Sequence, residues 1–142
     1  MPTLHWSQTL SVGVPLIDEH HRDFVARLGR VEGADDAALL EAWRELIDVI
    51  AAHFALEERW MREARFAQAA AHGLQHQMVL RVLRDAERDG DAGNLTLVRQ
   101  MARELATWFP LHLNGMDAAF ARHLRSTGRP ASPLHGGACA PA

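Results

Sequence analysis

The chain has 142 residues, which is the size of one domain, and its 48% hydrophobic and 23% charged residues are typical of a globular protein. A net charge of -3 and a pI near 6.3 argue against a dedicated nucleic-acid or polybasic membrane-binding protein. Lysine and tyrosine are absent and Cys139 is the one cysteine, which excludes Schiff-base lysines, tyrosyl radicals, internal disulfides, thiolate zinc sites and iron–sulfur clusters.

Residues 1–15 predict an irregular N-terminal arm because Pro2, Gly13 and Pro15 interrupt any regular element. This segment lacks the charged and apolar regions of a signal peptide, and no later apolar run approaches the roughly 18 residues of a membrane span. We therefore expect a cytoplasmic protein with no membrane insertion.

Four helices are predicted after the arm, each from an apolar stripe that repeats every three or four residues. Their expected N-caps are Asp18 for the first, Asp35 or Asp36 for the second, and Asn94 for the fourth. The predicted ranges are about 18–31, 36–62, 69–89 and 95–112, followed by a short fifth helix over about 116–126.

Helices joined by short links predict an all-α fold, an up-down-up-down antiparallel four-helix bundle with an irregular N-terminal arm and a short C-terminal helix. We expect this bundle to comprise residues 1–126. The remaining segment, 127–142, is rich in Gly and Pro and is expected to be a disordered tail.

Histidines and one glutamate occupy stripe positions where a core residue such as Leu is expected. The antiparallel topology brings all of them to one end of the bundle. A lone core histidine is more often a hydrogen-bonded structural residue, but an unpaired buried carboxylate costs several kcal/mol, and a metal ion offsets that cost. The residues are His21, His53, Glu57, His72, His76 and His112.

The spacing of these residues is typical of chelating helices. His53 and Glu57 are an i, i+4 pair, as are the two histidines of the third helix, and such pairs face the same way. Asp117 follows His112 by five residues, an offset of roughly 140° on a straight helix, so it reaches the same site only if the helix breaks between them. Glu58 lies off this face and is expected to be solvated.

Four segments in this order resemble the signature segments of the hemerythrin family, and within it those of bacteriohemerythrins. Trp6 and the segment 11–14 resemble the N-terminal arm of that family, so the resemblance covers about residues 4–125. It implies a four-helix bundle with a non-haem di-iron centre that binds dioxygen reversibly. The segments are Ile17-Asp18-Glu19-His20-His21, His53-Phe54-Ala55-Leu56-Glu57-Glu58, His72-Gly73-Leu74-Gln75-His76 and His112-Leu113-Asn114-Gly115-Met116-Asp117.

The resemblance implies two iron ions with a bridging oxo or hydroxo group, and it leaves one coordination position open for dioxygen. Glu57 and Asp117 are the implied bridging carboxylates. Where the family usually has Gln this chain has His20, and the position of its neighbour in the apolar stripe favours that neighbour, His21, as the ligand. The implied iron ligands are His21, His53, Glu57, His72, His76, His112 and Asp117.

An apolar pocket beside the irons is expected to keep water and protons away from bound dioxygen. Trp60 stands where the family has Leu, and it either shapes this pocket or is an ordinary core residue. The candidate lining residues are Phe24, Phe54, Leu56, Trp60, Val79 and Leu113.

We expect an oxygen carrier, store or delivery protein and not an enzyme. An oxygen or redox sensor is disfavoured because the length leaves no room for a fused output domain. A di-iron enzyme that handles peroxide or nitric oxide is disfavoured because the stripes carry no further acid or base, and a haem-binding bundle because of the clustered carboxylates. The oxygen affinity, the oligomeric state and the identity of an oxygen-consuming partner protein stay open.

Overall fold

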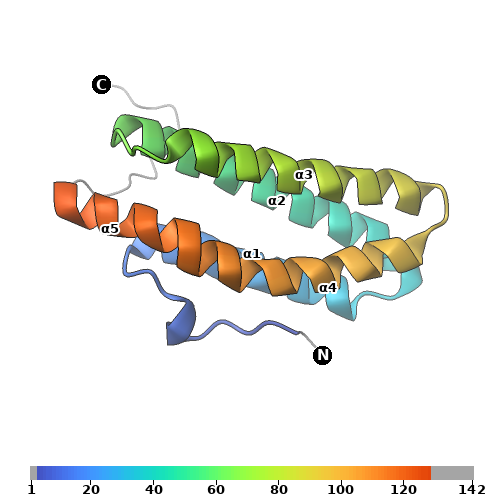
Figure 1. Cartoon of the computed structure of the whole chain (residues 1–142). Coiled ribbons are helices and arrows are strands. Elements are labelled where there is room, and N and C mark those ends of the chain that lie inside the picture. Colours follow the sequence, from blue (N-terminus) through green and yellow to red (C-terminus); the bar gives the residue numbers. More distant parts are fainter. Residues whose placement is uncertain (1–2, 129–142) are drawn as a thin grey trace, which may run out of the picture.

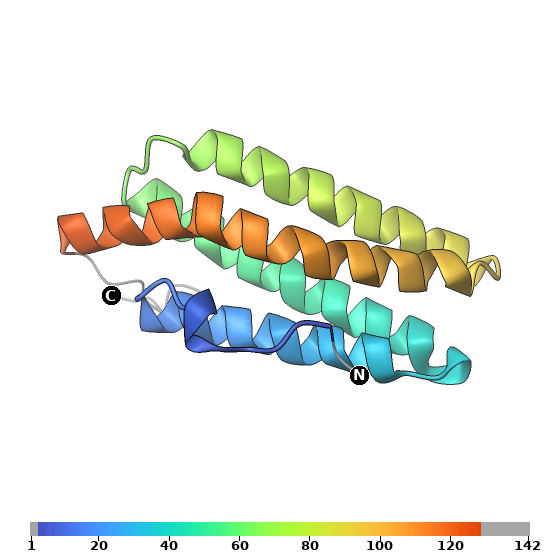
Figure 2. The same cartoon turned by 60° about the horizontal axis from the view of Figure 1, so that its bottom comes forward.

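The computed structural model describes residues 3–128, which form an antiparallel bundle of four long helices (Figure 1). A π-helical turn, η2 (Leu113–Asp117), joins the fourth helix to the short helix α5 (Ala118–Thr127), and the three run on as one rod (Figure 2). The predicted all-α, up-down-up-down bundle is confirmed. Its long helices are α1 (Pro15–Gly33), α2 (Asp36–Glu63), α3 (Ala69–Asp91) and α4 (Leu95–His112).

The N-caps of α2 and α4 are those that the sequence predicts. Asp35 Oδ1 accepts a hydrogen bond from the Ala38 N–H, and Asn94 Oδ1 accepts one from the Leu97 N–H. Each contact satisfies one of the backbone donors that the first turn of a helix leaves without a partner. These caps define where two of the long helices begin.

The prediction that Asp18 caps α1 is wrong, because the helix begins earlier, at Pro15. Proline suits a first turn because its missing N–H would have no partner there. Asp18 lies inside the helix, where its carboxylate accepts hydrogen bonds from the Val12 N–H and the Ser11 hydroxyl. The acid therefore ties the arm to α1.

The N-terminal arm is irregular, as predicted, apart from a 3-10 turn, η1 (Gln8–Leu10), and it lies along α1 (Figure 2). Its side chains Leu10, Val12 and Val14 are buried against the bundle. At its start the Thr3 N–H and hydroxyl both donate to the Glu32 carboxylate near the end of α1. The arm thus covers one side of the first helix.

The apolar core includes the half of the bundle that contains the α1–α2 and α3–α4 links, and it continues at the opposite end through Met61 and Phe120. Leu39, Trp43 and Leu46 of α2 are each 0% exposed, and the Trp43 indole N–H donates to the Leu83 carbonyl at 3.1 Å. This close-packed half holds the helices in register. The buried polar groups lie between this half and the apolar residues at the other end.

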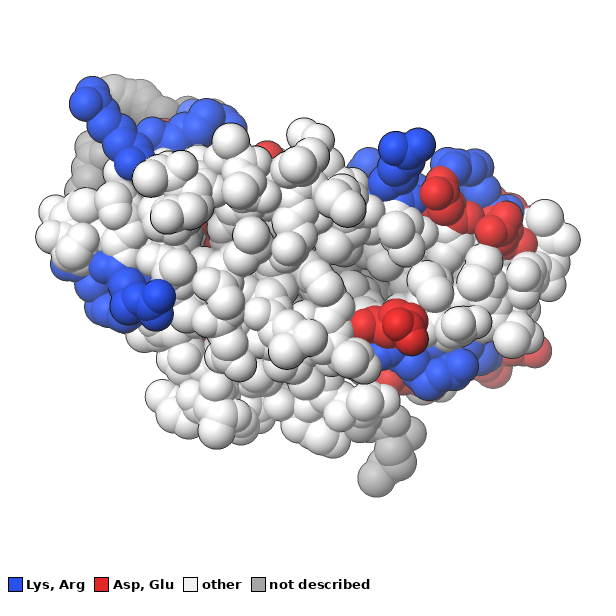
Figure 3. All heavy atoms as spheres, viewed as in Figure 1, with Lys and Arg blue, Asp and Glu red and all other residues white. Residues whose placement is uncertain are grey.

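The exposed large hydrophobic side chains of the described residues lie on α3 and α4. Leu74, Met78 and Val82 follow one face of α3 and are 58%, 61% and 49% exposed, and Leu111 of α4 is 71% exposed. Figure 3 shows this side of the molecule, where uncharged surface spans the middle and charged side chains gather toward the ends. None of the helices in the described part of the chain has both the length and the hydropathy needed to cross a bilayer.

The C-terminal helix α5 extends one residue further than predicted, to Thr127, and Gly128 follows it with a φ of 69°. Glycine adopts this left-handed conformation at no steric cost, which makes it a common helix terminator. Thr127, the first residue of the expected tail, is therefore helical, and residues 129–142 of that segment lie outside the described residues.

Candidate metal centre

Five buried histidine and acidic side chains from α2, α3, α4 and η2 come together toward the end of the bundle that contains the α2–α3 link. Each offers one ligand atom, and all of these atoms lie within 4.8 Å of one another. Imidazole nitrogens and carboxylate oxygens in this mixture suit a first-row transition metal such as iron. The residues are Glu57, His72, His76, His112 and Asp117, each less than a tenth exposed.

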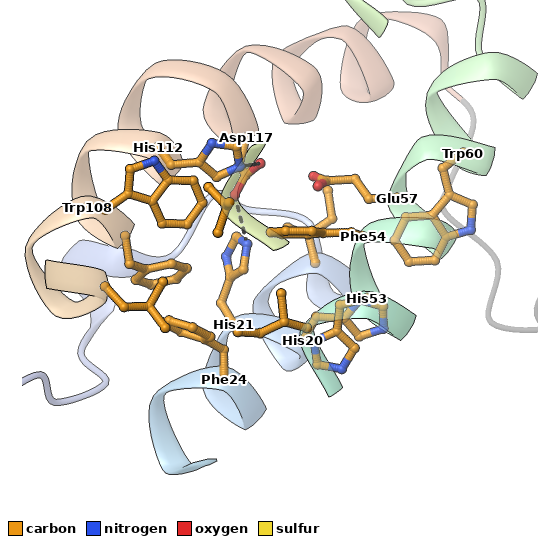
Figure 4. A pocket seen from close by; sticks show the side chains of 15 residues that line it. His20, His21, Phe24, His53, Phe54, Glu57, Trp60, Trp108, His112 and Asp117 are labelled. Atoms are coloured by element: carbon orange, nitrogen blue, oxygen red, sulfur yellow. Dashed lines mark ion pairs between the residues drawn. The ribbon is translucent and has the colours of Figure 1, made fainter. Parts of the chain in front are cut away.

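The Asp117 carboxylate lies between histidines on both of its sides (Figure 4). Its Oδ1 is 3.0 Å from His72 Nε2 and 3.1 Å from His112 Nε2, and its Oδ2 is 3.0 Å from His21 Nε2. Burial acts to raise the pKa of Asp117, but its contacts with His112, His21 and His72 outweigh burial and hold the pKa well below its usual value. Asp117 is therefore an anion placed to contact ligands on two sides.

Glu57 is the second buried carboxylate of the cluster. Its Oε1 is 3.3 Å from His76 Nε2 and 3.5 Å from His72 Nε2. Burial, together with the charge of Asp117, raises the pKa of Glu57. Two carboxylates that share a buried site in this way favour a bound cation, which would let both ionise.

A π-helical turn places Asp117 beside His112. The expectation of a helix break between them is wrong, because the chain stays helical and widens its turn instead. The Ala118 N–H donates to the Leu113 carbonyl, five residues earlier, and this spacing aligns residues five apart. Pro110, inside α4 just before this turn, has no backbone N–H to donate and so weakens the regular α-helical pattern there.

Two of the histidines are held by side chains outside the cluster. The His76 Nδ1–H donates to Glu58 Oε2 at 2.9 Å, and the His112 Nδ1–H donates to Gln75 Oε1 at 2.5 Å. Each bond fixes the ring and leaves its Nε2 directed to the cluster, as is usual for metal-binding histidines. The expectation that Glu58 is solvated is therefore wrong. The sequence does not predict the contact of Gln75 with His112, and the one signal for it is that Gln75 directly adjoins a candidate ligand, His76.

Several buried polar atoms of the described residues lack a well-aligned hydrogen-bond partner. All of them belong to the expected ligands. An unsatisfied buried donor or acceptor costs about 1–3 kcal/mol, more if charged, so this concentration needs a compensating partner. A cation bound by the carboxylate oxygens and by the Nε2 of His76 would supply one, so the residues fit a metal. The atoms are His21 Nδ1, Glu57 Oε2, His72 Nδ1, His76 Nε2 and Asp117 Oδ1.

The two neighbouring histidines of α1 have different surroundings. His21 contacts Asp117, whereas His20 stacks on His53 with ring centroids 4.2 Å apart and on Trp60 at 5.4 Å. Figure 4 shows His20 and His53 together at the edge of the site. Of these two neighbours, His21 is the one that touches the cluster.

His53 stands apart from the other expected ligands. Its Nε2 lies 3.4 Å from Asp23 Oδ2, which is half-buried on α1. Burial, and then the proximity of His20, lowers the pKa of His53 to about 4. The ring is therefore neutral near pH 7, which is the form that binds a metal.

A cavity of about 40 Å³ adjoins the cluster (Figure 4). Phe24, Phe54, Trp60 and Val79 of the expected oxygen pocket line it, whereas Leu56 and Leu113 lie outside its lining. Apart from histidines and the two cluster carboxylates, its lining is apolar. The further apolar residues are Ile17, Ile50, Leu105, Trp108 and Phe109.

Comparison with known proteins places this chain in a described family. A family model described as the hemerythrin HHE cation binding domain matches residues 12–124, a range that contains every expected ligand. A bacteriohemerythrin from Ralstonia nicotianae is 32% identical over 90% of this chain and 93% of the relative. Bacteriohemerythrins from Stenotrophomonas maltophilia and Pseudomonas aeruginosa are 28% and 27% identical, over 89% and 88% of this chain and 84% of each relative.

Proposed function

Because the chain belongs to the hemerythrin family, we propose that it binds dioxygen reversibly at a di-iron centre, as an oxygen carrier, store or delivery protein. A cytoplasmic location is part of this proposal. One observation carries it, namely the small cavity beside a buried cluster of histidines and carboxylates.

The size and lining of this cavity favour a small apolar ligand. Its volume of about 40 Å³ exceeds the roughly 10–15 Å³ that one water needs by this measure, so a diatomic molecule fits. Phe24 and Phe54 contribute apolar surface to its lining. Such surface excludes water and protons, which would otherwise help reduced oxygen to leave.

The residues divide into two groups around the bridging carboxylates Glu57 and Asp117. We propose that three histidines, from α3 and α4, hold one iron, and that His21 and His53 hold the other, with an oxo or hydroxo bridge between the irons. When bound, the two irons supply the electrons that reversible dioxygen binding requires. The three histidines of the first group are His72, His76 and His112, whose ring centroids lie 4.5–5.3 Å apart.

His53 would have to turn in order to serve as a ligand. Its ring now contacts Asp23 and stacks on His20, and it lies outside the cluster although it lines the cavity. Since the ring is neutral near pH 7, no proton has to leave it first. We therefore propose that the His53 ring would turn from Asp23 toward the cluster to hold the second iron.

The lining residues also favour binding over catalysis. Among the described residues around the cavity, the titratable ones are the proposed ligands and His20. Burial lowers the pKa of His20, and its ring is occupied by stacking on His53 and Trp60. The cavity thus has no free acid positioned to donate protons to reduced oxygen.

The test is a spectroscopic cycle on protein loaded with ferrous iron under argon. Exposure to dioxygen should produce a charge-transfer absorption band, and a return to argon should remove it, over repeated cycles with the iron content constant. A band that forms once and never reverses would contradict the proposal and would favour a di-iron enzyme acting on peroxide or nitric oxide.

A further inference from the structure

A surface groove of about 400 Å³ lies between α3 and α4, on the face shown in Figure 3. Three of its lining residues, Val79, Leu105 and Trp108, also line the inner cavity. Each of these side chains touches both spaces, so together they form a wall one residue thick between the groove and the cavity.

The wall and the groove are mainly apolar. Met78 and Val82, on the surface side of the wall, are 61% and 49% exposed, and the three wall residues carry no charge. Water and ions lose hydrogen bonds when they enter an apolar region, whereas dioxygen has none to lose. An apolar wall of this kind therefore passes dioxygen and holds back water and protons.

The other sides of the cavity differ in burial or in polarity. Ile17, Phe24 and Phe109 are only 2–5% exposed, and Leu105 of the wall is equally buried at 4%. Phe54 is half-buried, but it lies face to face on His76 with centroids 3.7 Å apart. On the side toward α1 and α2 the stacked rings of His20, His53 and Trp60 line the cavity, and the two histidines there are half-buried and polar. Val79 and Trp108 are half-buried too, so the wall between α3 and α4 is an apolar part of the lining that a surface groove adjoins directly.

We propose that dioxygen reaches the cavity through this groove and that Val79 and Trp108 set its rate of passage. The proposal rests on the proposed function, since it concerns the same ligand and cavity. Trp108 also stacks on the proposed ligand His112, with centroids 4.4 Å apart, so its replacement would disturb the iron site as well. Val79 is therefore the better position for a test.

The first experiment measures dioxygen association and dissociation rate constants on the iron-loaded protein. Val79→Phe fills the gap between the wall side chains and should slow both rate constants about tenfold. Val79→Ala enlarges this gap and should accelerate both. Because Val79 also lines the cavity, its replacement changes the bound state as well, so the association rate constant is the readout of the wall. Unchanged association in both variants, or a change in affinity alone, would overturn the proposal. If Val79→Phe does not fold, Val79→Ala carries the same test in the opposite direction.

Leu111→Ala provides a matched control. Leu111 is an apolar residue of α4 that is 71% exposed and lines neither the groove nor the cavity. Both rate constants should stay at the wild-type values in this variant. If the rate constants of Leu111→Ala change as much as those of the Val79 variants, the wall does not control dioxygen entry.

A second experiment uses the metal-free protein and follows the shortening of the Trp60 fluorescence lifetime by dissolved dioxygen, because this quenching reports the rate at which dioxygen arrives at an indole. Trp60 lines the cavity and is 3% exposed, and replacing Trp6, Trp43 and Trp108 by Phe leaves it as the emitting residue. Adding Val79→Phe to this protein should slow the quenching, and adding Leu111→Ala should leave it unchanged. Equal quenching with and without Val79→Phe would mean another route and would overturn the proposal. This result does not depend on iron, so it separates a failed route from a failed function.

Discussion

His112 Nε2 lies 3.1 Å from Asp117 Oδ1, although these residues are five apart in the sequence. A regular α-helix would point their side chains in different directions, whereas the π turn of η2 points both into the same site. This turn amounts to one extra residue in a continuous helix. The helix thus gives up regular hydrogen bonding to place a second carboxylate in the site.

Removing one residue from this turn should separate the fold from the metal site. Deletion of the exposed Asn114 should let η2 revert to regular α-helix and rotate Asp117 by about 100° out of the cluster. We expect circular dichroism to show an intact bundle while iron falls to one or fewer per chain by elemental analysis. Asn114→Ala, which keeps the length, should retain iron, and a deletion variant that also retains two irons would contradict this role for the turn.

The two neighbouring histidines of α1 should differ in their effect on iron. His21 contacts Asp117, so His21→Ala should lose one iron and change the spectrum of the oxygenated protein. His20 stacks outside the cluster, so His20→Gln should keep both irons and a nearly wild-type spectrum. The measurement is iron per chain together with the absorption spectrum, and the reverse ranking would refute the assignment.

Trp60 should affect both stability and the lifetime of the oxygenated protein. It is 3% exposed and lines the cavity, so Trp60→Ala should cost about 3–5 kcal/mol in the free energy of unfolding, measured by denaturant titration. The opened space should admit water and accelerate oxidation to the di-ferric state, followed as decay of the oxygenated spectrum. Trp60→Leu should change that rate less. If the oxygenated spectrum of Trp60→Ala decays no faster than that of the wild type, Trp60 is an ordinary core residue with no role in the pocket.

The metal-free protein should lose stability in mildly acidic solution. Burial lowers the pKa of folded His53 to about 4, against 6.5 for the free side chain, so the unfolded chain binds more protons between these values. The stabilisation is therefore complete above about pH 6.5 and is lost as the pH falls toward 4, and the lowered pKa of His20 acts in the same direction. The raised pKa values of His72 and Glu57 act in the opposite direction, so the test is the difference between two proteins: as the pH falls, the melting temperature of the wild type should decrease relative to that of His53→Gln. Equal slopes would assign the acid sensitivity to other groups.

Much of the fold follows from local signals in the sequence. Apolar stripes at helical spacing predict the helices, and Asp35 and Asn94 mark two of their starts because an acceptor side chain suits a first turn. Asp18 fits the same rule, yet it lies inside α1 and binds the arm instead. Local chemistry alone cannot distinguish these uses, since the difference depends on a tertiary contact.

The candidate site is less fully predictable. The topology predicts that the stripe histidines meet at one end of the bundle. A π turn has no characteristic amino-acid composition, so the sequence does not predict how Asp117 reaches the site. The supporting contacts of Glu58 and Gln75 depend on how α2 and α3 face one another. The position of His53 depends on side-chain rotation, which periodicity does not report.

An oxygen-binding titration of the ferrous protein, with free dioxygen and iron determined on the same sample, distinguishes reversible binding from consumption of dioxygen. We expect uptake of one dioxygen for every two irons, and full release when the dioxygen is removed. Uptake without release, or consumption of more than one dioxygen for each pair of irons, would contradict reversible binding at a di-iron centre.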